Sequence, residues 1–337
     1  MAVTVLNERA IGALGGSSGG GATATKETIG LPLVQNIAPI DMPVSAPQSA
    51  AIAASVAAVN AAMPATLNAL KSDVAKAANS ANKRVFIVPS GTDAAPSLNA
   101  ACADAIAAGV FHVEIAPGSY NLATPWIVDP RLQIQAIGRV VLTPSGPTDS
   151  AIVRIGSTAH TSFDNTCHGE FVGFTLNGRT GQADIGIDIG DSNATPKNVG
   201  AGYTIRKCFF TAFKYGFRYL NNIWLVKQDS NFYFQNNVDV VVTSNVNAGE
   251  NLNFSACVFG NATEQSVLLK GGYGVGMSFT QCSFDYALSG FLFDGSDQTV
   301  NCTDCHFEFD TSTTYVRQTA GKTNNSFSIS GGVYVNS

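Results

Sequence analysis

The sequence predicts an all-β body, a right-handed parallel β-helix, in the C-terminal part of the chain. Three observations lead to this fold class. A short strand pattern returns at intervals of 22 to 27 residues between residues 208 and 307, a second short strand follows each copy, and turn-rich stretches separate the pairs. Coils of about 20–30 residues with two or three short strands are the unit of a β-solenoid.

The repeat is visible when the chain is aligned on a cysteine or small residue two positions before an aromatic residue. The aligned segments are Cys208-Phe209-Phe210, Ser230-Asn231-Phe232, Cys257-Val258-Phe259, Cys282-Ser283-Phe284 and Cys305-His306-Phe307. Segments 174–176 and 332–334 fit one coil earlier and one coil later. Equivalent residues of stacked coils form columns about 4.8 Å apart. The cysteine and aromatic positions should therefore form two interior columns, with the weakest register at Lys227 to Ser230, where a β-bulge would shift it by one residue.

A second strand is expected shortly after each aromatic position. These strands should cover 186–189, 216–219, 239–242, 266–269, 290–293 and 314–316. A leucine-rich horseshoe is disfavoured because Leu-dominated repeats with a fixed Asn are absent, and a sandwich would not keep one offset over seven repeats.

Residues 1–47 are expected to form an extended arm. The run Gly15 to Gly21 and four prolines after residue 31 prevent a helix or an independent core. Apolar pieces such as Val3 to Leu6 and Leu33-Val34 favour an arm that becomes ordered against a partner. The alternative is a floppy tail whose apolar residues have no role.

Residues 48–84 are Ala-rich and free of glycine, which predicts a helix. Its bulkier apolar residues follow one another at steps of three and four, with a four-residue stutter beside Pro64. These residues are Ile52, Val56, Val59, Met63, Leu67, Leu70 and Val74. Such a narrow heptad seam favours a small parallel bundle, such as a trimer, and the alternative is a lone helix packed on the next domain.

The β-helix domain is expected to cover 85–337 and to start with a strand at 85–88. A short helix over 98–108 should end at Gly109, because glycine is typical of helix ends. A half-buried strand at 111–115 and the turn Ala116 to Ser119 follow.

The start of this domain resembles the N-terminal signature of pectate-lyase-like β-helix proteins. The resemblance lies in Thr92 to Ala95, in 98–108 and in Val113 to Leu122, which includes Pro117-Gly118-Ser119-Tyr120. In that family an Ala-rich helix covers the open end of the β-helix core. Bacteriophage tail spikes and tail fibres commonly use this module after a virion-attaching arm. The sequence departs from the signature at Pro96, near the helix start, and at Gly109-Val110, where a Gly pair is usual. The order of arm, helical seam and β-helix resembles a trimeric phage tail spike or fibre.

Composition and charge exclude several classes of function. With 19 Lys+Arg against 24 Asp+Glu, a net charge of −5 and no basic cluster, nucleic acid is not an expected partner. No uncharged apolar run approaches the roughly 20 residues of a membrane span, and the first residues do not read as a signal peptide. The seven cysteines are expected to be reduced, buried thiols. No cofactor is expected, because no phosphate loop or dinucleotide fingerprint occurs in a strand–helix context.

The weak candidates for catalysis are Asp285 and Glu308. Each follows a column aromatic, so the two carboxylates should share one outward column on adjacent coils. Glycoside hydrolysis needs carboxyl groups about 5–5.5 Å apart for retention, or about 6.5–9.5 Å apart for inversion. The alternative is that both are simply solvated surface groups. Further acidic residues near coil corners are Asp188, Asp191, Asp294 and Asp297.

Other possible sites have weaker support. No metal site is expected, because Cys302 and Cys305 have no further ligands at matching spacing and Cys305 belongs to the interior column. The four histidines are expected to be surface or packing residues. Several aromatic residues near turns could stack on carbohydrate or pack inside, namely Tyr203, Phe213, Tyr215, Tyr219, Trp224, Tyr233 and Tyr273.

The resemblance implies a virion structural protein, a homotrimeric tail fibre or tail spike made in the host bacterial cytoplasm and assembled into the tail. Residues 1–47 would dock to tail or adaptor proteins, and the β-helix would contact the host surface during adsorption. The alternative is a tail spike depolymerase that cleaves bacterial surface polysaccharide, and a third reading is a secreted pectin-degrading protein. The final coil at Tyr334 to Ser337 has no visible capping domain, so another fibre protein or trimer contacts are expected to cover it.

Overall fold

The computed structural model describes residues 84–156, 168–192, 202–243, 248–271, 274–309 and 314–336, with six further residues between 50 and 58. Those six are helical and exposed. The predictions for 1–47 and for most of 48–84 lie outside the described residues. The described residues from 84 onward belong to one compact unit. Among the described residues, no helix combines the length and apolar character needed to cross a membrane.

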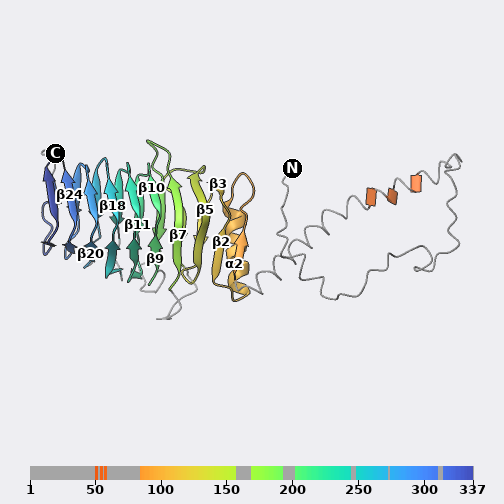
Figure 1. Cartoon of the computed structure of the whole chain (residues 1–337), viewed down its shortest axis with the longest axis horizontal. Helices are drawn as coiled ribbons and strands as arrows, with labels where there is room; N and C mark the ends of the chain where they lie inside the picture. The colour runs from red at the N-terminus through yellow and green to blue at the C-terminus, as the bar shows by residue number, and fades with distance from the viewer. Residues whose placement is uncertain are drawn as a thin grey trace, which may run out of the picture. The chain divides into compact units, whose positions relative to one another are not determined.

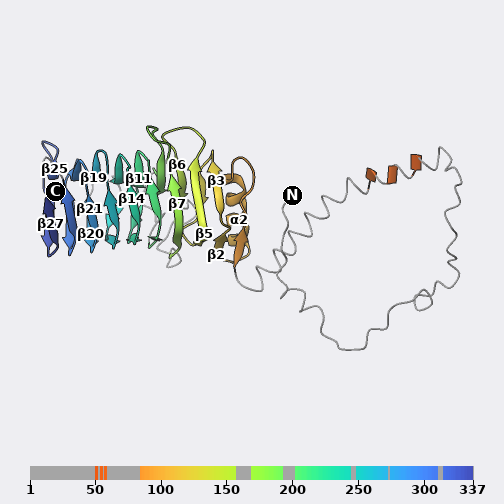
Figure 2. The same cartoon turned by 45° about the horizontal axis from the view of Figure 1, so that its top comes forward.

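The described body is a parallel β-helix, as predicted, with helix α2 (Ala95–Ala107) at one end and the final coil at the other (Figures 1 and 2). Its coils contribute strands to three ladders. The first ladder contains β1 (Val85–Ile87), β2 (His112–Ile115), β9 (Thr204–Arg206), β13 (Lys227–Asp229), β17 (Leu252–Ser255), β20 (Gly276–Thr280), β23 (Thr299–Thr303) and β26 (Ser326–Ser330). The second contains β3 (Gly118–Leu122), β10 (Phe209–Thr211), β14 (Phe232–Phe234), β18 (Val258–Gly260), β21 (Ser283–Asp285), β24 (His306–Phe309) and β27 (Val333–Asn336).

The third ladder is a separate eight-stranded sheet and contains the predicted second strands. It consists of β4 (Trp126–Val128), β6 (Ala151–Ile155), β8 (Ile185–Ile189), β11 (Tyr215–Tyr219), β15 (Val238–Val242), β19 (Gln265–Leu269), β22 (Ser289–Phe293) and β25 (Thr314–Gln318). Strands β5 (Gln133–Pro144) and β7 (Glu170–Asn177) turn the corner without a break and join the first two ladders into one sheet. A short pair, β12 (Ile223–Trp224) and β16 (Ala248–Glu250), lies outside these ladders.

The aromatic column of the second ladder is confirmed at most coils. The in-register positions are Leu176, Phe210, Tyr233, Phe259, Phe284, Phe307 and Tyr334. From Phe210 onward, neighbouring rings stack with centroids 4.7–5.3 Å apart and planes within 9° of parallel. Stacked rings of this kind add a directional attraction to the burial of apolar area, which helps to hold the coils in register.

The predicted alignment is wrong at one coil. The interior ring there is Tyr233, while Phe232 points outward and is 37% exposed. Asn231 occupies the cysteine position, where its Oδ1 accepts a hydrogen bond from the Cys208 amide and its Nδ2 donates to the Ile205 carbonyl. Ser230 is the corner residue, with φ of +54°. The polar side chain of Asn231 is tolerated at this interior position because its amide forms hydrogen bonds with buried backbone groups. An alignment that looks for a cysteine or small residue at this position therefore misses Asn231 and selects Ser230 instead.

A left-handed residue marks the corner between the first and second ladders. The corner residues are Lys207, Ser230, Ala256, Gln281, Asp304 and Gly331, with φ between +50° and +71°. From Lys207 to Asp304, the backbone amide of each corner residue donates to a carbonyl of the next coil. Each corner residue precedes its column aromatic by three positions.

Helix α2 starts three residues earlier than predicted and ends at Ala107. Pro96 falls in the first turn, where a helix needs no amide donor, so the departure from the family signature leaves the helix intact. Ala95, Leu98, Cys102 and Ala105 are buried against the end of the core. The six described cysteines are free and buried, as expected, and burial raises the pKa of Cys208 to about 12.

Candidate functional site

Strands β21 and β24 bring four polar side chains together on the outer surface of the second ladder. Phe284 and Phe307 fill the interior column, so the residues on either side of them point outward. The register pairs Asp285 with Glu308 and Ser283 with His306. The two carboxylates therefore share one outward column on adjacent coils, as the sequence predicts, while their role in catalysis stays a prediction.

Hydrogen bonds connect these side chains. The Ser283 hydroxyl donates to Asp285 Oδ1 at 2.7 Å and lies 3.0 Å from His306 Nδ1. His306 Nδ1 is also 3.4 Å from Asp285 Oδ1. This is not a Ser-His-Asp relay, because serine and aspartate approach the same ring nitrogen and the imidazole cannot pass a proton between them.

Tyr286 completes the cluster from the turn after β21. Its hydroxyl donates to Glu308 Oε1, and this hydrogen bond raises the pKa of the Tyr286 phenol. Asp285, His306 and Glu308 each offer one atom that could bind a metal ion, and these three atoms all lie within 4.8 Å of one another. We call Ser283, Asp285, Tyr286, His306 and Glu308 the outer cluster.

The charge around the outer cluster differs from that around several other carboxylates. Elsewhere in the described residues, many carboxylates pair with Arg or Lys. These pairs are Glu114–Arg84, Asp129–Arg131, Asp149–Lys214, Glu170–Arg206, Asp184–Arg179 and Asp188–Arg218. In the outer cluster, the polar partners of the two carboxylates among the described residues are the hydroxyls of Ser283 and Tyr286 and the imidazole of His306. Two carboxylates are therefore brought together with no guanidinium or ammonium partner from the part of the chain that the structure describes.

The spacing limits what this carboxylate pair can do. One oxygen of each carboxylate lies within 4.8 Å of the other, which is close to the roughly 5–5.5 Å between the carboxyl groups of retaining glycosidases. The two oxygens are much closer than the ~6.5–9.5 Å that leaves room for a water in inverting enzymes. The arrangement therefore does not suit an inverting acid–base pair, whereas it suits a shared cation or hydrogen bonds to a polar ligand.

An aromatic strip, Phe209, Phe232 and Phe234, lies in the same two outward columns. Phe209 and Phe232 stack with centroids 5.3 Å apart, and Phe234 lies 6.1 Å from Phe232. Val258 and Gly260 occupy the coil between this strip and the outer cluster. In the sequence only the run of aromatic residues Phe232-Tyr233-Phe234 is visible, and the structure shows that its first and third rings point outward.

The aromatic residues expected near turns mostly pack inside. Tyr203, Phe213, Tyr219 and Tyr233 are fully buried in the core, which confirms the packing alternative for these four. Tyr215 and Trp224 are partly buried, and Tyr273 lies outside the described residues.

The remaining acidic candidates do not join the outer cluster. Asp188 is buried and forms a bidentate pair with Arg218, at 2.8 and 2.7 Å. Asp191, Asp294 and Asp297 accept hydrogen bonds from the side chains of Asn222, Thr319 and Asn324, respectively, which link neighbouring coils. Their contacts are structural. Cys302 and Cys305 are buried in the interior, as predicted.

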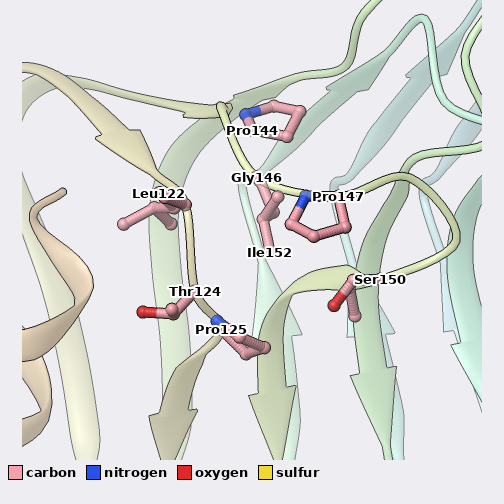
Figure 3. Close-up of a pocket in the computed structure, with 10 residues that line it drawn as sticks. Leu122, Thr124, Pro125, Pro144, Gly146, Pro147, Ser150 and Ile152 are labelled. Atoms are coloured by element: carbon pink, nitrogen blue, oxygen red, sulfur yellow. The ribbon is translucent and has the colours of Figure 1, made fainter.

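A small pocket lies near the capped end of the β-helix (Figure 3). Thr124 and Pro125 line one side, and Pro144, Gly146 and Pro147 line the other. None of its ten lining residues is ionisable, so the pocket offers no acid, base or metal ligand.

Comparison with known proteins bears on the fold. No family model matches the chain, and no curated protein matches it. The enzymatically active domain of tailspike protein 2 of bacteriophage CBA120 is similar in structure, with a TM-score of 0.50 and 14% identity over 74% of this chain and 43% of that one. DFA-IIIase from Arthrobacter chlorophenolicus A6, solved with DFA-III, has a TM-score of 0.51 and 14% identity over 75% of this chain and 76% of that one.

The chain thus spans less than half the length of the tailspike structure that it matches. At 14% sequence identity, these structural similarities show a shared fold and do not show a shared function. The fold implied by the sequence resemblance is confirmed: the chain is a parallel β-helix of the kind found in a phage tailspike domain and in a bacterial DFA-IIIase.

Proposed function

We propose that the chain is a bacteriophage tail spike or tail fibre protein, a component of the virion tail whose β-helix binds polysaccharide on the host surface. The observation that carries this proposal is the aromatic strip beside the outer cluster, on a β-helix similar in fold to the tailspike domain. The sequence order of arm, heptad seam and β-helix supports the same assignment.

The outer face has the chemistry that a glycan requires. The C–H face of a sugar ring is apolar and packs on an aromatic ring, while its hydroxyl rim needs donors and acceptors. Phe209 and Phe232 supply adjacent ring faces. The polar groups of Ser283 and Asp285 lie two coils beyond Phe232, and that of Glu308 lies three coils beyond it. Because the coils stack at a constant spacing of about 4.8 Å, the face is a straight row that suits an extended polymer.

Binding can be tested with purified capsule or lipopolysaccharide of the host by isothermal titration calorimetry. We expect Phe232→Ala to weaken binding at least ~10-fold, because truncating an aromatic anchor commonly costs 2 kcal/mol or more. Phe86→Ala is the matched control, since Phe86 is exposed in β1 at the capped end of the body. Equal affinities for the two variants would exclude the aromatic strip as the binding surface.

Trimer formation and attachment to the tail belong to the same proposal. The seam over 48–84 would set the trimer register, and the arm over 1–47 would dock to a tail or adaptor protein. Light scattering on the full chain should give three times the monomer mass of 35.1 kDa. A monomeric mass would exclude the trimer.

Glycan cleavage on the same face is a second candidate function, favoured by the paired carboxylates of Asp285 and Glu308. Because their spacing is too short for an inverting pair, release of reducing ends from the host polysaccharide would have to follow a retaining mechanism. Release that is abolished in both Asp285→Asn and Glu308→Gln would establish a depolymerase instead.

A further inference from the structure

The geometry points to a divalent cation site formed by Asp285, His306 and Glu308, which takes a borderline first-row ion such as Zn²⁺. The inference does not depend on the proposed function. It rests on the types of donor atom, their separation, the uncompensated charge around them and the hydrogen bonds that position them.

The donor set selects the class of ion. Two carboxylates and one imidazole offer two oxygens and a nitrogen. Ca²⁺ and Mg²⁺ prefer oxygen ligands alone, whereas imidazole combined with carboxylate suits Zn²⁺ and related ions. Three protein ligands leave at least one coordination position for water or for an oxygen of another molecule.

The separation of the donors is compatible with one ion. For three atoms within 4.8 Å of one another, a point exists no more than about 2.8 Å from each (4.8 divided by √3). Zinc–ligand distances are about 2.0–2.2 Å to nitrogen and oxygen. Each donor therefore has to move by less than about 1 Å, which rotation of partly exposed side chains can supply.

The surroundings favour a cation. No Arg or Lys in the described residues forms an ion pair with Asp285 or Glu308, so two negative charges on adjacent coils repel each other until a cation neutralises them. Ser283 and Tyr286 hold these carboxylates by hydrogen bonds, as the supporting residues around metal ligands commonly do.

The site is also accessible. The side chains of His306 and Asp285 are 38% and 25% exposed. On the preceding coil the position in register with Asp285 is Gly260, which has no side chain to obstruct approach from that side. An ion or a polar ligand can therefore reach the three donor groups from the outer surface of the second ladder.

The test is a titration of the metal-free, reduced full chain with ZnCl₂ by isothermal titration calorimetry, followed by Co²⁺ as a spectroscopic probe. We expect one site per chain and a Co²⁺ spectrum without thiolate charge-transfer bands. Asp285→Asn, Glu308→Gln and His306→Ala should each weaken binding at least ~10-fold, the scale on which even supporting residues act. All three lie on the surface, and thermal melts of each variant check that it is folded.

Matched controls are Glu264→Gln and His168→Ala, which change exposed residues of the same types away from the outer cluster. They should bind Zn²⁺ like the parent chain. Absence of binding in the parent chain would overturn the inference. Equal weakening in controls and site variants, or thiolate bands with Co²⁺, would overturn it as well, because the ion would then be bound elsewhere.

Discussion

Replacing Asp93 with alanine should weaken the attachment of helix α2 to the β-helix. Asp93 precedes α2, and its Oδ1 accepts hydrogen bonds from the amides of Ala95 at 3.1 Å and Ala123 at 2.9 Å. Its Oδ2 accepts a third from the Thr124 hydroxyl at 2.9 Å. One carboxylate thus ties the helix start to the corner between β3 and β4.

The expected loss follows from these three bonds. A hydrogen bond to a charged group contributes about 1.5–3 kcal/mol to the free energy of unfolding. At a half-exposed site, water can take the place of the lost partner and recover part of this contribution. We therefore expect Asp93→Ala to lower the free energy of unfolding of the capped end by about 2–4 kcal/mol. Asp93→Asn keeps an acceptor without the charge, so it should lose about half as much.

The effect should depend on pH. Burial pushes the pKa of Asp93 up, but the hydrogen bonds from Ala123, Ala95 and Thr124 outweigh it and hold the pKa below its usual value. A depressed pKa in the folded state means that the stabilisation is present above the unfolded pKa of about 3.9 and is lost as pH falls through the folded value. The difference between the parent chain and Asp93→Ala should therefore be larger at pH 7 than at pH 3.

Hydrogen exchange of the α2 amides is the appropriate assay, because a solenoid need not unfold as one cooperative unit. Asp104→Ala is the control, since Asp104 is exposed on the same helix and its loss should change stability by less than about 0.5 kcal/mol. Unchanged exchange in Asp93→Ala, or equal effects of the two variants, would refute the proposed role of Asp93.

Three further predictions concern the interior and the corners. Burial raises the pKa of Asp239 well above its usual value. The contribution of this group to stability is therefore greatest below about pH 4 and declines as pH rises. Asp239→Asn should have a higher melting temperature than the parent chain at pH 8 and lose that advantage at pH 4. At the corner, Ala256→Gly should raise stability by up to ~1 kcal/mol and Ala256→Val should lower it, as chemical denaturation can measure, because only glycine tolerates φ of +50° without strain. With a pKa of about 12, Cys208 should resist alkylation at pH 8 until the chain unfolds, and peptide mapping that finds rapid labelling in the folded chain would contradict its burial.

The sequence predicts the coils because stacked coils require similar side chains at equivalent positions. Phe259, Phe284 and Phe307 form a column for this reason, and their spacing alone locates β18, β21 and β24. The register fails at Phe232 because three consecutive aromatic residues do not show which of them points inward. The identity of the inward ring depends on the corner conformation at Ser230, which the residue type does not reveal.

The candidate site is only partly predictable for a related reason. Columns place Asp285 beside Glu308, so this pair follows from the repeat. His306 and Tyr286 join it through side-chain orientation, which the repeat does not define. The three possible metal ligands lie 2 to 23 residues apart on two coils, so they form no local pattern of the kind by which zinc sites are recognised in a sequence.

The left-handed corner fixes where the coils can vary in length. Each interior ring follows its corner residue at a constant distance of three residues, although successive corners are 23 to 27 residues apart. All insertions and deletions among these coils therefore fall in the other connections. An added residue at this corner would exchange the inward and outward positions of the strand that follows it. The side chain of Asp285 or of Phe232 would then point into the core. Outward side chains can thus be replaced on one coil at a time without changing the interior. A pair of functional side chains moved to the same distances from the corner residue on a neighbouring coil would keep its separation and would still point outward.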